Sequence, residues 1–318
     1  MVNMNSSKSI FKHLKLNAFI SLFITVLFFS TSCQKKQTLT ENGSTPETKV
    51  AKPDTTVIAP EVIDGLLHSI PSPLEISLLI KKTVVSFISD ITNPYTNCDN
   101  YTTPFKQAVN LGVYSADIGY LGLYNKQTVS TLYVRCLRKL ADELKVGQFF
   151  TSEKLQRART YSTHPEQQDS LLTLITMSFE EMNEYLNEKN RRNVSVLIVT
   201  GAWIEALNLS LKVYEQNPSQ ALLERIGEQK IPLDNIRLVL SVFKNFPEFA
   251  PLIEHLDELK KVYDRVVITY TYGEPEFSEE HGMLVVQDKS TSKVEITPDI
   301  LNDIRALTIR IQKLVTAV

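Results

Sequence analysis

FKQAVNLGVYSADIGYLGLYNKQ, residues 105–127, is the stretch that decides the fold. Its apolar spacing is helical, yet it contains three glycines, and each glycine inside a helix costs about 1 kcal/mol relative to alanine. At about 100° per residue its small side chains fall within an arc of about 80°, so one face of the helix is almost bare. A bare face allows the backbone of a second helix to approach closely. The residues of this small-residue face are Ala108, Gly112, Ser115, Gly119 and Gly122.

The other sides of this predicted helix, residues 104–125, carry mostly large apolar side chains. A helix that is apolar on nearly all sides is buried, so we expect it at the centre of the domain. A second stretch of the same type, NVSVLIVTGAWIEALNLSLKVYE at 193–215, contains one glycine, Gly201. We predict that Gly201 faces the small-residue face and that the two helices pack against each other there.

Cap residues followed by proline mark further helix starts, as at Thr103-Pro104, Asn217-Pro218 and Thr297-Pro298. Short connections and only 10 glycines in 318 residues favour an all-α fold, an antiparallel bundle of about ten or eleven helices. We expect one helical domain over residues 61–318. The predicted helices cover about 61–69, 73–91, 104–125, 127–146, 151–162, 165–189, 191–216, 218–229, 232–245, 250–270 and 298–316.

Residues 262–297 interrupt the helical pattern. VVITYTY at 266–272 alternates as a strand does, but we interpret it as the end of the preceding helix. MLVVQ and KVEIT flank the polar segment DKSTS, which is typical of a turn between two strands. We therefore expect a small β-hairpin near 283–297.

Two acidic residues interrupt the buried helices. Asp117 lies almost opposite the small-residue face and on the side of Tyr120 and Tyr124, whereas Glu205 shares the Gly201 face with Asn208. One interpretation is a polar pocket in which a carboxylate acts as a general base or binds a cation. The other, which we favour, is a structural carboxylate held by hydrogen bonds, because a buried charge must be paired.

Cys98 and Cys136 are the two cysteines of the expected domain. Cys98 lies in a polar loop and Cys136 in a predicted helix, an arrangement that suits either a disulfide or two partly buried free thiols. Their spacing does not decide between these alternatives.

Several activities are disfavoured by composition and by missing motifs. The chain has 34 basic and 36 acidic residues, and no basic cluster that would indicate nucleic-acid binding. It contains no phosphate-binding loop, no nucleophile elbow, no dinucleotide-binding glycine pattern and no His-Glu-x-x-His motif. We therefore expect no metal site and no cofactor.

The first 32 residues form an export signal, because three lysines precede a short apolar run that ends in STSC at Cys33. This ending resembles the lipobox of bacterial lipoproteins, although Ser30 stands where a leucine-like residue is usual. The resemblance implies that Cys33 becomes lipid-modified; the alternatives are an ordinary signal peptide or an uncleaved anchor. Gln34 rather than aspartate after the cysteine resembles lipoproteins sorted to the outer membrane.

Residues 33–60 are rich in Thr, Lys, Pro and Glu and poor in large apolar side chains, so we predict that they form a disordered tether. The phrases LGVYSADIGYLGLYN and TGAWIEALNLSL are similar to uncharacterised exported helical proteins of Gram-negative bacteria, a resemblance that implies no activity. We predict a lipid-anchored cell-envelope protein, on the periplasmic or the surface side, that works as a binding or scaffolding module. Its partner is then a protein or a small ligand; the alternative is an enzyme that uses the polar pocket.

Overall fold

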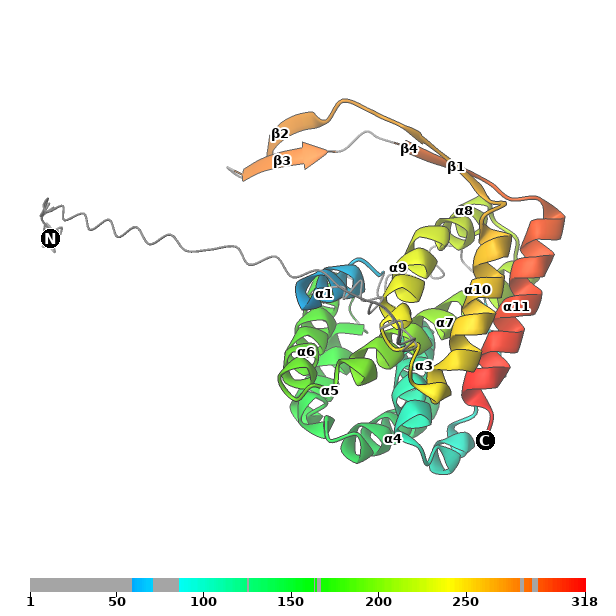
Figure 1. The fold of residues 1–318 in the computed structure, drawn as a ribbon. Coiled ribbons are helices and arrows are strands. Elements are labelled where there is room, and N and C mark those ends of the chain that lie inside the picture. The colour runs from blue at the N-terminus through cyan, green and yellow to red at the C-terminus, as the bar shows by residue number, and fades with distance from the viewer. Residues whose placement is uncertain are drawn as a thin grey trace, which may run out of the picture. The chain divides into compact units, whose positions relative to one another are not determined.

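A computed structural model describes residues 59–70, 86–124, 126–162, 164, 167–280, 283–287 and 291–318. These residues belong to a compact unit, Thr55–Val318. The unit is built from α-helices, with two short antiparallel strand pairs inserted between the last two helices, so the predicted all-α class with a small β-hairpin is confirmed (Figure 1). The expected export signal, Cys33 and nearly all of the expected tether lie outside the described residues.

The described α-helices are joined by short connections and three short 3-10 helices. The α-helices are α1 (Pro60–His68), α3 (Pro104–Leu123), α4 (Gln127–Glu143), α5 (Ser152–Ser162), α6 (Gln168–Glu188), α7 (Arg192–Gln216), α8 (Gln220–Glu228), α9 (Lys230–Ser241), α10 (Ala250–Tyr263) and α11 (Pro298–Thr316). The 3-10 helices are η1 (Tyr95–Asn100), η2 (Gly147–Phe149) and η4 (Pro247–Phe249).

Helices α3 and α7 form the centre of the unit and make the most extensive helix–helix contact in it. Among the described residues α7 is also the one helix long and apolar enough to cross a membrane, but 94% of its most apolar window is buried inside the protein. Length and composition alone are weak evidence for a membrane span, so we interpret α7 as a core helix.

The other helices surround this pair. Helix α4 packs on α3, α6 packs on α7, and α11 packs on both α7 and α10 (Figure 1). Helix α10 contacts α9, and α9 in turn contacts α1. This arrangement buries the apolar faces of the amphipathic helices against the two nearly all-apolar ones.

Side-chain caps start three of these helices. Thr103 accepts a hydrogen bond from the Lys106 amide at 3.2 Å at the start of α3, and Thr297 accepts one from the Ile300 amide at 3.4 Å at the start of α11. Both starts were predicted from a threonine followed by proline, and both are confirmed. Helix α8 differs, because its cap is Ser219 rather than a residue of the Asn-Pro pair before it.

The region between α10 and α11 departs from the sequence prediction. Residues 267–271 are not the end of a helix but a strand, β1 (Val267–Thr271), which pairs with β4 (Thr291–Glu295). The expected hairpin at 283–297 is wrong in its pairing, because β3 (Met283–Gln287) pairs with β2 (Glu276–Glu280) and not with β4. The register sets Glu280 opposite Met283, so β3 is paired with the strand before it in the chain rather than with the strand after it.

Residues 86–94 also differ from the prediction, since they form no helix although a helix was expected to continue to residue 91. Asp90 adopts a positive φ of 63°, which an α-helix does not allow. The remainder of that predicted helix lies outside the described residues.

Candidate functional site

The small-residue face meets α7 at two glycines. A Cβ atom added to Gly112 would lie 2.0 Å from the backbone oxygen of Ile198, and one added to Gly201 would lie 1.9 Å from the backbone oxygen of Val109. The two helix backbones therefore touch directly, as backbones do where glycines meet. Phe105 and Val194, near the starts of α3 and α7, line the same cavity, so the two helices run in the same direction.

The other residues of the small-residue face differ in how closely they are packed. Ala108 is fully buried, and the half-buried Ser115 returns its hydroxyl to the Leu111 carbonyl at 2.8 Å. Gly119 is half-buried, whereas a Cβ atom on Gly122 would meet nothing within 4 Å. The expectation that Gly122 packs closely against another helix is therefore wrong, because the close approach lies in the first half of α3.

Asp117 does not form a pocket with Tyr120 and Tyr124. Its carboxylate is fully buried, and one oxygen accepts a hydrogen bond from the Asn93 amide at 3.2 Å. The Tyr120 hydroxyl instead bonds to the backbone of Ile88, accepting from the amide at 3.0 Å and donating to the carbonyl at 3.2 Å. The proposed open cleft is absent here because the described segment before α3 covers these side chains.

Tyr120 and Tyr124 belong to an aromatic cluster with Phe87. The two tyrosine rings lie 5.1 Å apart, and the Phe87 ring lies 5.8 Å and 5.6 Å from them. The Tyr124 hydroxyl is buried and has no hydrogen-bond partner among the described residues. These tyrosines therefore act as rings packed against the core.

Glu205 and Asn208 lie together, as their shared helix face predicts. The Asn208 amide donates to one Glu205 oxygen at 3.0 Å, and Gln312 of α11 donates to the other at 3.3 Å. One further turn along α7, Lys212 donates to the Ile91 carbonyl at 2.8 Å. The sequence analysis missed Lys212 and Gln312, although Lys212 shares the helical face of Glu205 at a spacing of seven residues.

The two buried acids, placed in separate candidate pockets by the sequence, form one cluster in the structure. Burial and the nearby negative charge of Glu205 raise the pKa of Asp117 well above its ordinary value, against the opposing effects of the Asn93 amide and Lys212. Burial also raises the pKa of Glu205, while Asn208, Lys212 and Gln312 oppose that rise. Glu205 has two side-chain donors, whereas Asp117 accepts from one backbone amide, so the charged form of Asp117 is the less stabilised of the two.

This acid cluster is closed to solvent, since Asp117 and Glu205 are both 0% exposed. A general base must come within hydrogen-bond reach of its substrate, which neither carboxylate does in this conformation. Within the described residues, no group of three or more His, Cys, Asp or Glu side chains could hold a metal ion. The arrangement fits a structural role for the two acids.

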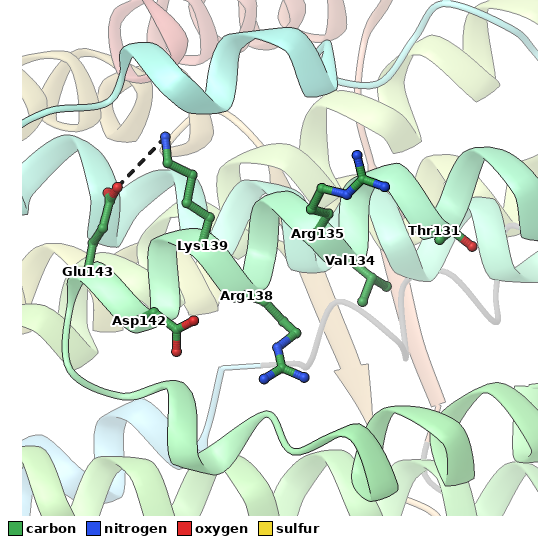
Figure 2. Close-up of a pocket in the computed structure, with 7 residues that line it drawn as sticks. All are labelled: Thr131, Val134, Arg135, Arg138, Lys139, Asp142 and Glu143. Atoms are coloured by element: carbon green, nitrogen blue, oxygen red, sulfur yellow. Dashed lines mark ion pairs between the residues drawn. The ribbon is translucent and has the colours of Figure 1, made fainter.

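Two hollows on the described part of the chain are considered as ligand sites, and the lining of neither includes Asp117 or Glu205. A shallow one of about 610 Å³ runs along α4 and is lined by that helix alone (Figure 2). Two of its three basic side chains already have partners, since Lys139 donates to Asp99 at 2.6 Å and Arg138 donates to Ser152 at 3.0 Å. We therefore assign no ligand to it.

The second hollow, of about 550 Å³, lies where α3 and α7 begin and is mostly apolar. Phe105 and Phe249 line it with their rings 5.3 Å apart, and Leu252 and Leu314 also line it. Lys106 at its rim is directed to the end of α11, where it donates to the Leu314 carbonyl at 2.8 Å. We call this hollow the apolar cavity.

An exposed row of large apolar side chains follows α9 and the turn after it. Ile231, Leu238, Val242 and Phe246 are 49%, 45%, 38% and 45% exposed. The first three fall within a 40° arc of the helix, about 130° from its buried face. Phe246 contacts Phe249 with ring centroids 5.9 Å apart, so this α9 row leads to the apolar cavity.

Sequence reasoning missed the α9 row. The signal was present, because residues 231–243 carry apolar side chains around most of the helix rather than on one face. Apolar side chains on all sides of a helix predict burial on all sides, but α9 is buried on one side only.

Comparison with known proteins adds no further assignment: no family model, no curated protein and no solved structure matches this sequence.

Proposed function

We propose that this protein is a lipid-anchored component of the bacterial cell envelope whose helical domain binds another protein through the α9 row. The supporting observation is that three large apolar side chains lie exposed along one face of α9, with exposed Phe246 in the turn beyond it, while the polar core is closed. Soluble surfaces seldom expose aligned apolar side chains unless they are used for binding.

The spacing of the row points to an apolar helical segment as the partner. From Ile231 to Val242 the row extends about 16 Å along α9, which is the length of about three helical turns. A partner helix with apolar residues at matching spacing would pack along it, and an aromatic or leucine side chain would enter the apolar cavity. The expected lipid at Cys33 would hold the domain near membrane partners.

Crosslinking followed by binding measurements tests the docking surface. A photoreactive amino acid replaces Leu238 in the full-length protein in cell membranes, and a partner crosslinked there is identified and purified. We expect Leu238→Asp to weaken the binding of this purified partner at least tenfold, because the change places a charge in an apolar contact. The matched control is Val129→Asp on α4, where a valine of 40% exposure receives the same charge.

Unchanged binding by Leu238→Asp, with its melting temperature equal to that of the wild type, would disprove the docking surface. Equal weakening by Val129→Asp would mean that added negative charge rather than the row decides binding. The lipid anchor is tested separately by fatty-acid labelling of the wild type and of Cys33→Ser. Export without incorporation of fatty acid would disprove the anchor and leave the docking result unaffected.

A second candidate function is the binding of a small apolar molecule, supported by the apolar cavity. Leu197, Phe249 and Leu252 line a volume in the range of small-ligand sites. Native mass spectrometry of the purified full-length protein tests this alternative. A bound molecule of constant mass that is lost in Leu252→Trp would favour it over a protein partner.

An enzyme acting through the acid cluster is the third reading, and the geometry supports it least. Asp117 and Glu205 have no solvent-exposed atoms through which a substrate could reach them. In this proposal the two acids therefore have a structural role and do not form a substrate pocket.

A further inference from the structure

We propose that Cys98 and Cys136 form an intrachain disulfide when the protein folds in an oxidising compartment, and that this bond fastens residues 86–101 to α4. In the structure both cysteines are buried free thiols. Two observations support the bond: the register of η1 against α4, which brings Cys98 close to Cys136, and the position of the fastened segment over the acid cluster.

The register of η1 on α4 places the two cysteines opposite each other. The Cys136 thiol donates to the Tyr95 carbonyl at 3.1 Å, and the Tyr95 ring packs on Tyr133 with centroids 6.0 Å apart. One turn farther along both elements, Lys139 donates to Asp99 at 2.6 Å. Cys98 lies between these contacts along η1, and burial together with the neighbouring Cys98 raises the pKa of the Cys136 thiol.

Burial determines when the bond can form. Cys98 is 8% exposed and Cys136 is 3% exposed, and burial raises the pKa of the Cys136 thiol to about 12. The thiolate is the reactive form, so exchange in the folded protein is slow. The bond therefore forms while the chain is folding, before η1 closes over α4.

The oxidant is a disulfide, either a small one or that of an exported thiol oxidoreductase. One cysteine thiolate attacks it, which forms a mixed disulfide and releases one thiol. The second cysteine thiolate then displaces the second thiol, so two protein thiols are oxidised and one external disulfide is reduced to two thiols. Exported proteins meet such an oxidant, whereas cytosolic proteins stay reduced.

The fastened segment covers the acid cluster. It supplies the Asn93 amide to Asp117 and the Ile91 carbonyl to Lys212, and it ties down Tyr114 through the Pro94 carbonyl at 2.9 Å. A covalent bond from this segment to α4 opposes opening of the cover. The sequence left both a disulfide and two free thiols open, and the contacts of η1 now favour the disulfide.

Peptide mapping of the exported full-length protein tests the bond. Trypsin places Cys98 in the peptide 83–106 and Cys136 in the tripeptide 136–138, so one linked peptide of defined mass identifies the disulfide. We expect this peptide in protein digested without reductant and not after reduction. The Cys98→Ser and Cys136→Ser variants should lack it. Alkylation of both thiols after unfolding without reductant, or a crosslink to Cys33, would overturn the proposal.

A second measurement keeps the test independent of the variants and of export. The reduced full-length protein is unfolded and refolded with oxidised glutathione, and its melting temperature is compared with that of the same sample after reduction. Because a crosslink restricts the unfolded chain, we expect the oxidised form to melt about 5 °C higher. Refolded protein that keeps two free thiols, or that carries glutathione on Cys98, would contradict the proposal.

Discussion

Replacement of Gly112 by alanine tests the central contact of the fold most directly. The added methyl carbon would lie 2.0 Å from the Ile198 oxygen and 2.6 Å from the Ala202 nitrogen, whereas ordinary contacts begin near 3.4 Å. The helices must therefore separate locally by about 1.4 Å, the difference between 3.4 and 2.0 Å. Both obstructing atoms belong to backbone, so neither can rotate away as a side chain would.

The magnitude follows from two opposing effects. Overpacking of a tight core contact costs about 1–3 kcal/mol, and the rigid obstruction at Gly112 places this change at the upper end of the range. Replacement of a helical glycine by alanine returns about 1 kcal/mol of helix propensity. We expect a net loss of about 2 kcal/mol, which corresponds to a melting temperature lower by about 4–8 °C for a domain of this size.

Gly122→Ala is the matched control, because it makes the same chemical change in the same helix. Nothing lies within 4 Å of the added methyl group, so only the gain in helix propensity remains. We expect its melting temperature to rise by about 1–3 °C. Thermal and urea unfolding of both variants give the comparison. If Gly112→Ala were as stable as Gly122→Ala, the backbone contact between α3 and α7 would be refuted.

Three further predictions concern buried polar groups. Burial raises the pKa of Asp117 and of Glu205 in the folded protein. Their contribution to the free energy of unfolding is therefore complete below their ordinary pKa values of about 4, and it falls as the pH rises toward the raised pKa values. Asp117→Asn should flatten this decline, measured by urea unfolding between pH 4 and 8. Trp203→Phe removes a 2.9 Å hydrogen bond to the Gln229 side chain and should lower the unfolding free energy by about 1–3 kcal/mol in urea unfolding, with an unchanged result contradicting the bond. Tyr263→Phe removes a buried 3.0 Å bond to a backbone carbonyl and should cost about 1 kcal/mol by the same assay, whereas a stabilised variant would contradict the geometry.

The two candidate acids show which contacts helical periodicity predicts and which it does not. The helical period predicted that Glu205 and Asn208 share a face, and their 3.0 Å hydrogen bond lies within one helix. It could not place Asp117 beside Glu205, because these residues are 88 positions apart and meet only through the packing of α3 on α7. The loop amide of Asn93, which bonds to Asp117, follows no periodic pattern that could have identified it.

The pairing of the strands could not be predicted from their sequences. The alternation at 266–272 and the run MLVVQ were both visible, but alternation does not determine which strands pair. Pairing depends on where the chain reverses, and the structure reverses it between Glu280 and Met283. A polar segment farther along resembled a turn more closely, and local turn preference alone led to the wrong partner.

The sequence by itself determined the helical class, the capped starts of α3 and α11, and the two nearly all-apolar helices that become the core. These features depend on interactions within a few residues, which helical periodicity and cap chemistry record directly. Only the tertiary structure decided that Gly112 and not Gly122 meets α7, that Asp117 and Glu205 form one cluster, and that the α9 row stays exposed. Each of these depends on which helices become neighbours, and that follows from the packing of the whole domain rather than from any one segment.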